Sequence, residues 1–145
     1  MNLLHEVKIT RVQNAAAVGT TTLTTAAVDM MGWDGVMFVV AFGTITDGTP
    51  SVKARQGQVS NMSDGADLAG TLTAGAITDD TKLLALDIYR PLERYVDAQI
   101  VRGGATGAVV DGMIAIQYRG RVKPPVQDAT VAASEAHTSP VEGTA

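Results

Sequence analysis

Apolar and polar positions alternate over short distances along the first 120 residues, and no segment keeps a helical period of apolar residues. Val7 and Ile9 alternate with polar neighbours, which predicts a short strand with one buried face. Residues 36–42 (VMFVVAF) are continuously apolar, are too few for a typical helix and are partly β-branched. Such a run predicts a central strand that is covered on both faces.

The other strand signals are spaced between turn residues. Alternating or β-branched segments predict strands over residues 20–28, 52–58, 83–88, 94–102 and 109–118. In residues 94–102 the alternation predicts which side chains face inward (Val96, Ala98, Ile100) and which face outward (Tyr95, Asp97, Gln99). Residues 14–19 and most of residues 61–80 are predicted to be loops, and Asp111 with Gly112 is predicted to form a bulge.

Six to eight short strands joined by turns predict an all-β fold, an antiparallel β-sandwich or jelly roll with extended N- and C-terminal arms. Pro124 and Pro125 stop the last strand, because proline cannot donate a hydrogen bond to a neighbouring strand. Residues 127–145 hold no large apolar side chain that would anchor them. We therefore predict one domain over residues 1–120 and an arm over residues 121–145, which is either disordered or ordered only against a partner.

Composition and charge exclude several classes of function. The sequence has no cysteine, which excludes disulfides, thiolate metal sites and cysteine nucleophiles. Its net charge is −4, and this mild acidity argues against nucleic acid as a partner. The longest apolar run is far shorter than the roughly 20 residues of a membrane-spanning helix, so no membrane partner is expected. The N-terminal residues do not have the pattern of a signal peptide.

Residues that could carry catalysis are few. The histidines are His5, beside the N-terminus, and His137, in the arm, so neither is expected beside a nucleophile in a rigid pocket. Two acidic pairs in the long loop are interpreted as turn formers, with a weak structural cation as the alternative: Asp64 with Asp67, and Asp79 with Asp80. The glycine-rich segment 103–107 lacks the ending of a phosphate-binding loop and is interpreted as a hairpin turn. We expect no catalytic residue, no metal and no cofactor.

Tryptophan and arginine residues suggest where a partner could bind. Trp33, the sole tryptophan, is interpreted as a core plug at one end of the sandwich or as an exposed interface anchor. The late basic residues are expected to be solvated strand ends or a patch for an acidic partner; they are Arg90, Arg94, Arg102, Arg119, Arg121 and Lys123. Asp87 and Asp97 are expected to protect strand edges or to pair with Arg90, Arg94 or Arg102.

Several segments together resemble one family of small phage proteins. They are residues 86–96 (LDIYRPLERYV), 108–118 (AVVDGMIAIQY) and 121–125 (RVKPP), together with Trp33, Asp34 and Gly35 before the buried strand. In these segments the chain is similar to the capsid cement, or decoration, proteins of tailed bacteriophages. The resemblance covers about residues 5–145. It implies a jelly-roll sandwich without catalytic residues.

The resemblance also implies a structural role on the virion exterior, after synthesis in the bacterial cytoplasm. It implies binding to the outside of an HK97-type capsid shell, which cements neighbouring capsomers against internal DNA pressure. The implied partners are the major capsid protein and the chain itself, as a homodimer or a homotrimer.

We expect the interface to use Trp33, Tyr89, Arg90, Arg94, Tyr95, Tyr118, Arg119 and Arg121. Two other functions stay open. One is a carbohydrate- or receptor-binding β-sandwich on the virion, which the low aromatic content disfavours. The other is a small hydrolase that uses Asp64 and Asp67, which nothing in the sequence fixes on rigid elements.

Overall fold

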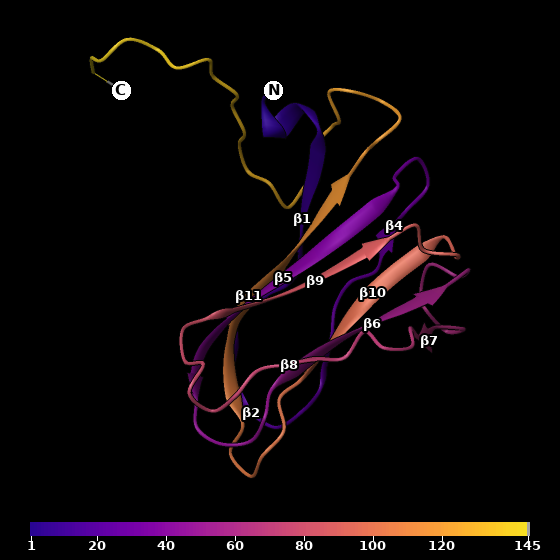
Figure 1. Ribbon diagram of the computed structural model, residues 1–145, viewed down its shortest axis with the longest axis vertical. Helices are drawn as coiled ribbons and strands as arrows, with labels where there is room; N and C mark the ends of the chain where they lie inside the picture. The colour runs from indigo at the N-terminus through magenta and orange to yellow at the C-terminus, as the bar shows by residue number, and fades with distance from the viewer. Residues whose placement is uncertain (145) are drawn as a thin grey trace.

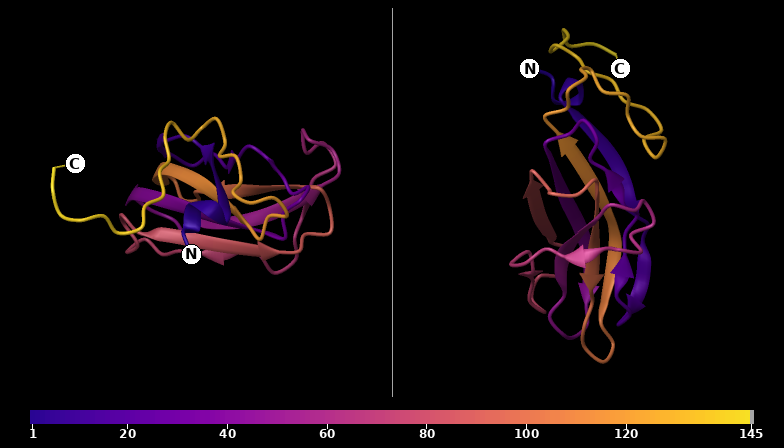
Figure 2. Two further views of the ribbon diagram at one scale, coloured as in Figure 1. Left: turned by 90° about the horizontal axis from the view of Figure 1, so that it is seen from above. Right: turned by 90° about the vertical axis from the view of Figure 1, so that its right-hand side faces the viewer.

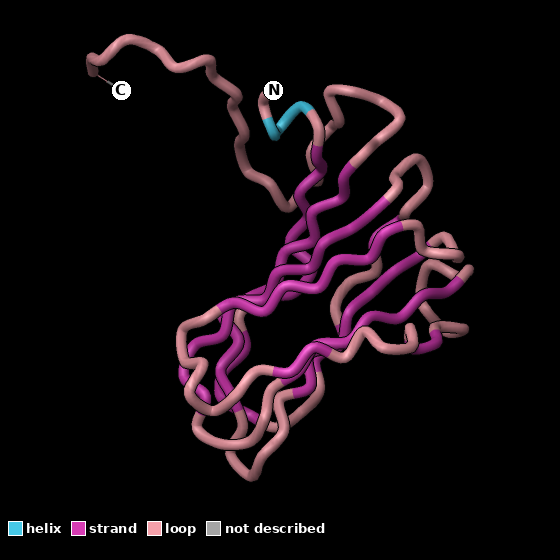
Figure 3. The backbone as a smooth tube through the Cα atoms, in the orientation of Figure 1, coloured by secondary structure: helices cyan, strands magenta, loops and turns pink. Residues whose placement is uncertain are grey.

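The computed structural model describes residues 1–144 and consists of two antiparallel sheets packed face to face (Figures 1 and 3). Sheet I holds, in order, β1 (Val7–Gln13), β11 (Ala108–Tyr118), β5 (Gly35–Ile45) and β9 (Leu83–Tyr89), and β2 (Ala16–Gly19) also pairs with β11. Sheet II has β10 (Tyr95–Val101) and β6 (Ser51–Gly57) at its centre. Two-residue strands flank them: β3 (Leu23–Thr24) and β4 (Val28–Asp29) beside β10, and β7 (Ala66–Asp67) and β8 (Thr73–Ala74) beside β6.

The chain passes back and forth between the two sheets in the order of a jelly roll. β1 lies in sheet I, β3 and β4 in sheet II, β5 in sheet I and β6 to β8 in sheet II, after which β9, β10 and β11 alternate between the sheets. The predicted all-β sandwich is therefore confirmed. A short 3₁₀ turn, η1 (Leu3–His5), precedes β1. Within residues 1–144, no helix has the length and apolar character needed to cross a membrane.

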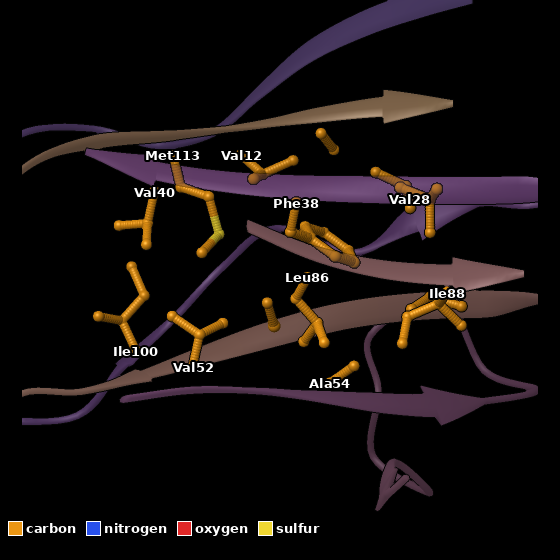
Figure 4. Close-up of a cluster of buried hydrophobic side chains, with 14 of the residues drawn as sticks. Val12, Val28, Phe38, Val40, Val52, Ala54, Leu86, Ile88, Ile100 and Met113 are labelled. Carbon is orange, nitrogen blue, oxygen red and sulfur yellow. The ribbon is translucent and has the colours of Figure 1, made fainter. Parts of the chain in front are cut away.

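Apolar side chains from both sheets fill the space between them (Figure 4). Phe38 of β5 and Met113 of β11 belong to the same buried cluster as Ile100 of β10 on the other side of the sandwich. These side chains are buried because alternate residues of each strand face the partner sheet. The predicted inward face of β10 is confirmed, since its three residues are fully buried: Val96, Ala98 and Ile100.

The outer face of sheet I differs from the prediction made for residues 36–42. Met37 and Val39 of β5 are only partly buried. On this face they lie opposite Ile116 and Ile114 of β11, within the same sheet, rather than under a third layer of structure. The prediction that both faces of this strand are covered is therefore wrong for the outer face. We call Met37, Val39, Ile114 and Ile116 the outer apolar face.

Residues 16–19 form β2 against β11, although they are predicted to be loop. The side chain of Arg102 explains this difference. Its guanidinium donates hydrogen bonds to the carbonyl oxygens of Ala17 (2.6 Å) and Thr21 (2.8 Å), which fixes the segment without a strand-like sequence. Arg102 is 6% exposed, so its interpretation as a solvated strand end or a patch residue is wrong.

The predicted strand over residues 20–28 exists only as the short β3 and β4. Between them the Thr25 side chain replaces part of the regular ladder. The backbone N–H of Thr25 donates to the carbonyl of Ala98 (3.0 Å), and the Thr25 hydroxyl oxygen accepts from the N–H of Ala98 (3.0 Å). The predicted bulge is confirmed, because the pairing of β11 with β5 shifts register between Val110 and Gly112.

Segment 103–107 joins β10 in sheet II to β11 in sheet I, so it is not a hairpin turn between paired strands. The Asp47 carboxylate organises this loop by accepting hydrogen bonds from the N–H groups of Gly107, Ala105 (2.8 Å) and Thr106 (3.0 Å). These bonds, that from Gly107 foremost, hold the pKa of Asp47 below its usual value.

The first part of the C-terminal arm lies along β1. Gln127 accepts a hydrogen bond from the N–H of Ile9 (2.8 Å) and donates to the carbonyl of Val7 (2.8 Å), and the Thr130 hydroxyl accepts from the N–H of Arg11 (2.8 Å). The interpretation that nothing anchors the chain from residue 127 onward is thus wrong for residues 127–130. The anchoring is polar rather than apolar, and the rest of the arm extends away from the sandwich (Figures 1 and 2).

Candidate interface at one end of the sandwich

Tyr118 lies across the first residue of β5. Gly35 pairs with Tyr118 of β11 on one side and with Tyr89 of β9 on the other. A side chain at position 35 would overlap the Tyr118 ring, so glycine allows the ring to cross β5 toward β9. There the Tyr118 hydroxyl donates a hydrogen bond to Asp87 (2.7 Å). Burial, together with this bond, raises the pKa of Tyr118 to about 12.

Two arginine side chains lie close to the Tyr89 ring. The guanidinium carbon of Arg90 is 5.2 Å from the centre of the Tyr89 ring, and that of Arg119 is 5.8 Å away. Arg119 also donates to the Tyr89 hydroxyl (3.3 Å), and its Nε is 3.5 Å from the Asp34 carboxylate. Within residues 1–144, Arg90 forms no ion pair. Its charge is therefore available to an acidic group of a partner.

Both arginines adopt the left-handed backbone conformation, with φ of 53° at Arg90 and 55° at Arg119. For a residue other than glycine this conformation costs on the order of 1–3 kcal/mol. Backbone hydrogen bonds around Asp34 hold the two turns: the N–H of Arg90 donates to the Asp34 carbonyl (2.7 Å), and the N–H of Asp34 donates to the Tyr118 carbonyl (3.3 Å). The two turns thereby direct both arginine side chains over Tyr89.

Arg94 and Tyr95 extend this group onto sheet II. The Arg94 guanidinium donates to both carboxylate oxygens of Asp29 (3.0 and 2.7 Å) and lies 5.2 Å from the centre of the Tyr95 ring. The hydrogen bond between Arg94 and Asp29 is the main cause that lowers the pKa of Asp29 and raises the pKa of Arg94. Because both side chains are about two-fifths exposed, the pair contributes little to stability and stays accessible to a partner.

Trp33 and Arg121 lie beside the same strand ends. The Trp33 ring packs on Gly120, where an added Cβ would lie 2.7 Å from a ring carbon, and it also contacts the hydrophobic core. Trp33 is thus a plug at one end of the sandwich, and it also lines a groove of about 260 Å³ with Pro124 and Pro125. The N–H of Arg121 donates to the Gly32 carbonyl (2.9 Å), and its side chain is exposed.

Hydrogen bonds within sheet II and between the two sheets bring these residues to one end of the molecule. The N–H of Met30 donates to the Arg94 carbonyl (2.8 Å), and the Gln117 side chain of β11 donates to the Asp29 carbonyl (2.8 Å). All the predicted interface residues therefore share this end. We call it the Tyr–Arg end: Trp33, Tyr89, Arg90, Arg94, Tyr95, Tyr118, Arg119 and Arg121.

The Tyr–Arg end has the composition of a protein-binding surface. No protein-family model and no curated protein matches this chain. The role of this end therefore follows from its own chemistry. Tyrosine, tryptophan and arginine are the residues most enriched at the centres of protein interfaces. Guanidinium groups that already stack on aromatic rings lose less freedom when they bind a carboxylate.

The sequence interpretation missed a second exposed feature, the outer apolar face. Met37 and Ile116 pair with each other two residues along their strands from Gly35 and Tyr118, on the same side of sheet I. Val39 and Ile114 continue the row, and Ile114 is 37% exposed. The signal was present in the apolar run 36–42, whose odd-numbered residues must share one side of the strand. What the run could not show is that, within residues 1–144, no further layer of protein covers this side.

The predicted ion-pair partners of Asp97 in sheet II were also wrong. Asp97, predicted to face outward, is 1% exposed and accepts two hydrogen bonds from Arg55 at 3.0 and 2.6 Å. The two residues are direct partners between β10 and β6. The prediction that Asp97 pairs with Arg90, Arg94 or Arg102 is therefore wrong. Asp87 lies on β9 at the edge of sheet I, as one of its two interpretations has it, and accepts its hydrogen bond from Tyr118.

The acidic residues of the long loop bind local backbone and lysine groups. Asp64 accepts hydrogen bonds from the N–H groups of residues 58 and 59, and Asp79 accepts from that of residue 76, as expected of turn formers. Asp67 instead pairs with Lys53 (2.6 Å), and Asp80 accepts from the N–H of residue 45 (2.6 Å). Within residues 1–144, no group of three or more acidic or histidine side chains is placed to hold a metal ion.

Proposed function

We propose that this protein is a structural virion subunit that binds the outer surface of a tailed-phage capsid and cements neighbouring capsomers. The observation that carries the proposal is the Tyr–Arg end, where arginines stacked on tyrosines project from a rigid jelly roll. Arg90 supports it most directly, since it is stacked, held in a strained turn and without an ion pair among the described residues. The resemblance of residues 86–96 to capsid cement proteins falls on this same region, the end of β9 and the start of β10.

The outer apolar face supports a broad contact rather than a small pocket. It adjoins the Tyr–Arg end, so an apolar centre and a charged margin lie side by side, as in stable protein interfaces. Such interfaces bury on the order of 1,200–2,000 Å² in total, and repetition over a closed shell adds avidity. The proposed partners are the major capsid protein, through acidic groups that meet the arginines, and a second copy of this chain. The proposed location is the capsid exterior.

A sugar-binding function finds less support at this surface. Stacking on a sugar ring requires an open aromatic face. Trp33 packs on Gly120, and the Tyr118 ring lies across Gly35. The Tyr89 ring is about half exposed, but the guanidinium groups of Arg90 and Arg119 already lie close to it.

The proposal is tested by co-sedimentation of the purified protein with capsids from which this subunit has been removed. The informative variant is Arg90→Gly with Arg119→Gly, because glycine accepts the left-handed backbone at both positions and removes only the side chains. We expect saturable binding by the natural protein at a fixed ratio to the capsid protein. For the variant we expect binding at least about 30-fold weaker, the loss typical of an interface hot spot.

Lys53→Ala is the matched control, since Lys53 is a basic residue on β6 of sheet II, away from both the Tyr–Arg end and the outer apolar face. It should bind capsids as the natural protein does. Equal binding by the double-glycine variant would reject the Tyr–Arg end as the contact. If the folded natural protein does not bind capsids at all, the cement function itself is rejected, and a screen against glycans tests the alternative.

A further inference from the structure

The two sheets have four edges, and three of them are covered or very short. Along β1, the side chains of Gln127 and Thr130 take the N–H groups of Ile9 and Arg11. Both edges of sheet II end in strands of two residues, β3 with β4 on one side and β7 with β8 on the other. Covering and shortening are the usual ways in which proteins prevent pairing between sheet edges. In the described part of the chain, the fourth edge, β9, is neither covered nor short.

β9 is seven residues long and pairs with β5 on one side only. The backbone bonds at its two ends show which groups point outward: the N–H of Phe42 donates to the Lys82 carbonyl, and that of Arg90 donates to the Asp34 carbonyl. Even-numbered residues of this segment therefore bond to β5, because antiparallel bonding alternates along a strand. The odd-numbered residues direct their N–H and C=O groups to the open edge; they are Leu83, Ala85, Asp87 and Tyr89.

The side chains of these four residues are also exposed, with Leu83 at 64% and Tyr89 at 48%. β9 is self-complementary in one antiparallel register. If Ala85 lies opposite Asp87 of a second copy, then Leu83 lies opposite Tyr89, and each pair occurs twice. All the outward backbone groups then bond, which makes about eight hydrogen bonds. No like charges face each other directly, and the two exposed apolar side chains cover one another.

We infer that β9 is the contact strand of a homodimer in which two copies pair antiparallel along this edge. The two-fold axis of such a pair is perpendicular to the sheet. Sheet I thus continues into sheet I of the second copy, as β1-β11-β5-β9 followed by the same strands in reverse. This inference rests on the proposed function, which names a second copy of the chain as a partner, and it identifies β9 as the strand that contacts that copy.

The dimer geometry explains how one dimer could join two neighbouring capsomers on a flat surface. A two-fold axis perpendicular to the sheet keeps both outer apolar faces on the same side. The two strands run in opposite directions, so the two Tyr–Arg ends point away from each other. Each dimer would therefore present both outer apolar faces on one side, with an arginine group at either end, and could contact two neighbouring capsomers at once.

The full chain is tested by analytical ultracentrifugation over a range of concentrations, without capsids. Ala85→Pro removes an outward N–H that has no partner among residues 1–144, and an edge strand tolerates proline at such a position. We expect the natural chain to sediment as a dimer and Ala85→Pro to sediment as a monomer, with dimerisation at least about 100-fold weaker. Ala85→Thr is the matched control, because it keeps the N–H and a strand-forming side chain, and it should remain a dimer.

The register is tested by two charged variants. These variants also test the dimer contact itself if Ala85→Pro fails to fold. In the inferred register Ala85→Lys places an ammonium group opposite Asp87 of the second copy, so the dimer should become tighter. Ala85→Glu places a second carboxylate there, so the dimer should become weaker. Equal effects of the two variants would overturn the register.

A natural chain that stays monomeric at about 100 μM, or that sediments as a trimer, would overturn the edge-paired dimer. So would a folded Ala85→Pro variant that remains dimeric. The capsid assay separates this inference from the proposed function. An edge-paired dimer that does not bind capsids rejects the cement function alone, whereas a monomer that binds capsids rejects the dimer alone.

Discussion

Replacing Arg55 by methionine would leave the Asp97 carboxylate without its partner in sheet II. Asp97 is 1% exposed, and Arg55 supplies two donors to it at 3.0 and 2.6 Å. Removing one member of a buried ion pair costs roughly 3–5 kcal/mol, because the remaining charge stays desolvated. An unfolding entropy of about 2.1 cal/mol/K per residue, over roughly 120 ordered residues, converts each kcal/mol into about 4 °C of Tm. We therefore expect Arg55→Met to lower the Tm by roughly 12–20 °C.

The assay is thermal unfolding followed by far-ultraviolet circular dichroism, with urea unfolding as a second measure of the free energy. The matched control is the double variant Arg55→Met with Asp97→Val, which removes both charges and keeps apolar or β-branched side chains in the strands. It should recover most of the lost stability, because no buried charge is left unpaired. The reasoning is refuted if Arg55→Met lowers the Tm by less than about 4 °C, or if the double variant is no more stable than the single one.

Two further predictions concern groups with shifted pKa values. The folded state raises the pKa of Tyr118 from 10.0 to about 12, so stability should be intact below pH 10 and decline as the pH rises from there through 12. Tyr118→Phe should lose this decline in urea unfolding measured across that range, and the same slope in both proteins would contradict the assignment. The lowered pKa of Asp47 gives stability that is present above its ordinary value of 3.8 and is lost as the pH falls below it. Asp47→Ala should therefore speed amide hydrogen exchange at residues 105–107 at neutral pH, and unchanged exchange would rule out the carboxylate as the organiser of this loop.

Features of the fold that depend on near neighbours in the chain could be predicted from the sequence. Alternation correctly identified the buried apolar residues of β10, and the glycine at position 112 correctly marked the bulge in β11. β2 could not be predicted, because Arg102, distant in the sequence, holds it in place. The candidate interface could likewise be predicted only in part from the sequence. The sequence supplied its tyrosines and arginines, but only the folded chain could show that Gly35 makes room for Tyr118 and that both Arg90 and Arg119 lie close to the Tyr89 ring.

The sequence by itself determined that the protein is built from short strands and which side chains share one face of each strand, because both follow from patterns of adjacent residues. The tertiary structure alone decided which strands are neighbours and which faces and edges remain open. Strand register placed Arg55 opposite Asp97, and the jelly-roll order left β9 at an edge. These features depend on contacts between residues far apart in the chain. The sequence of an apolar run such as residues 36–42 predicts the same buried strand whether or not a further layer of protein covers its second face. Within residues 1–144 of this protein, no such layer covers it.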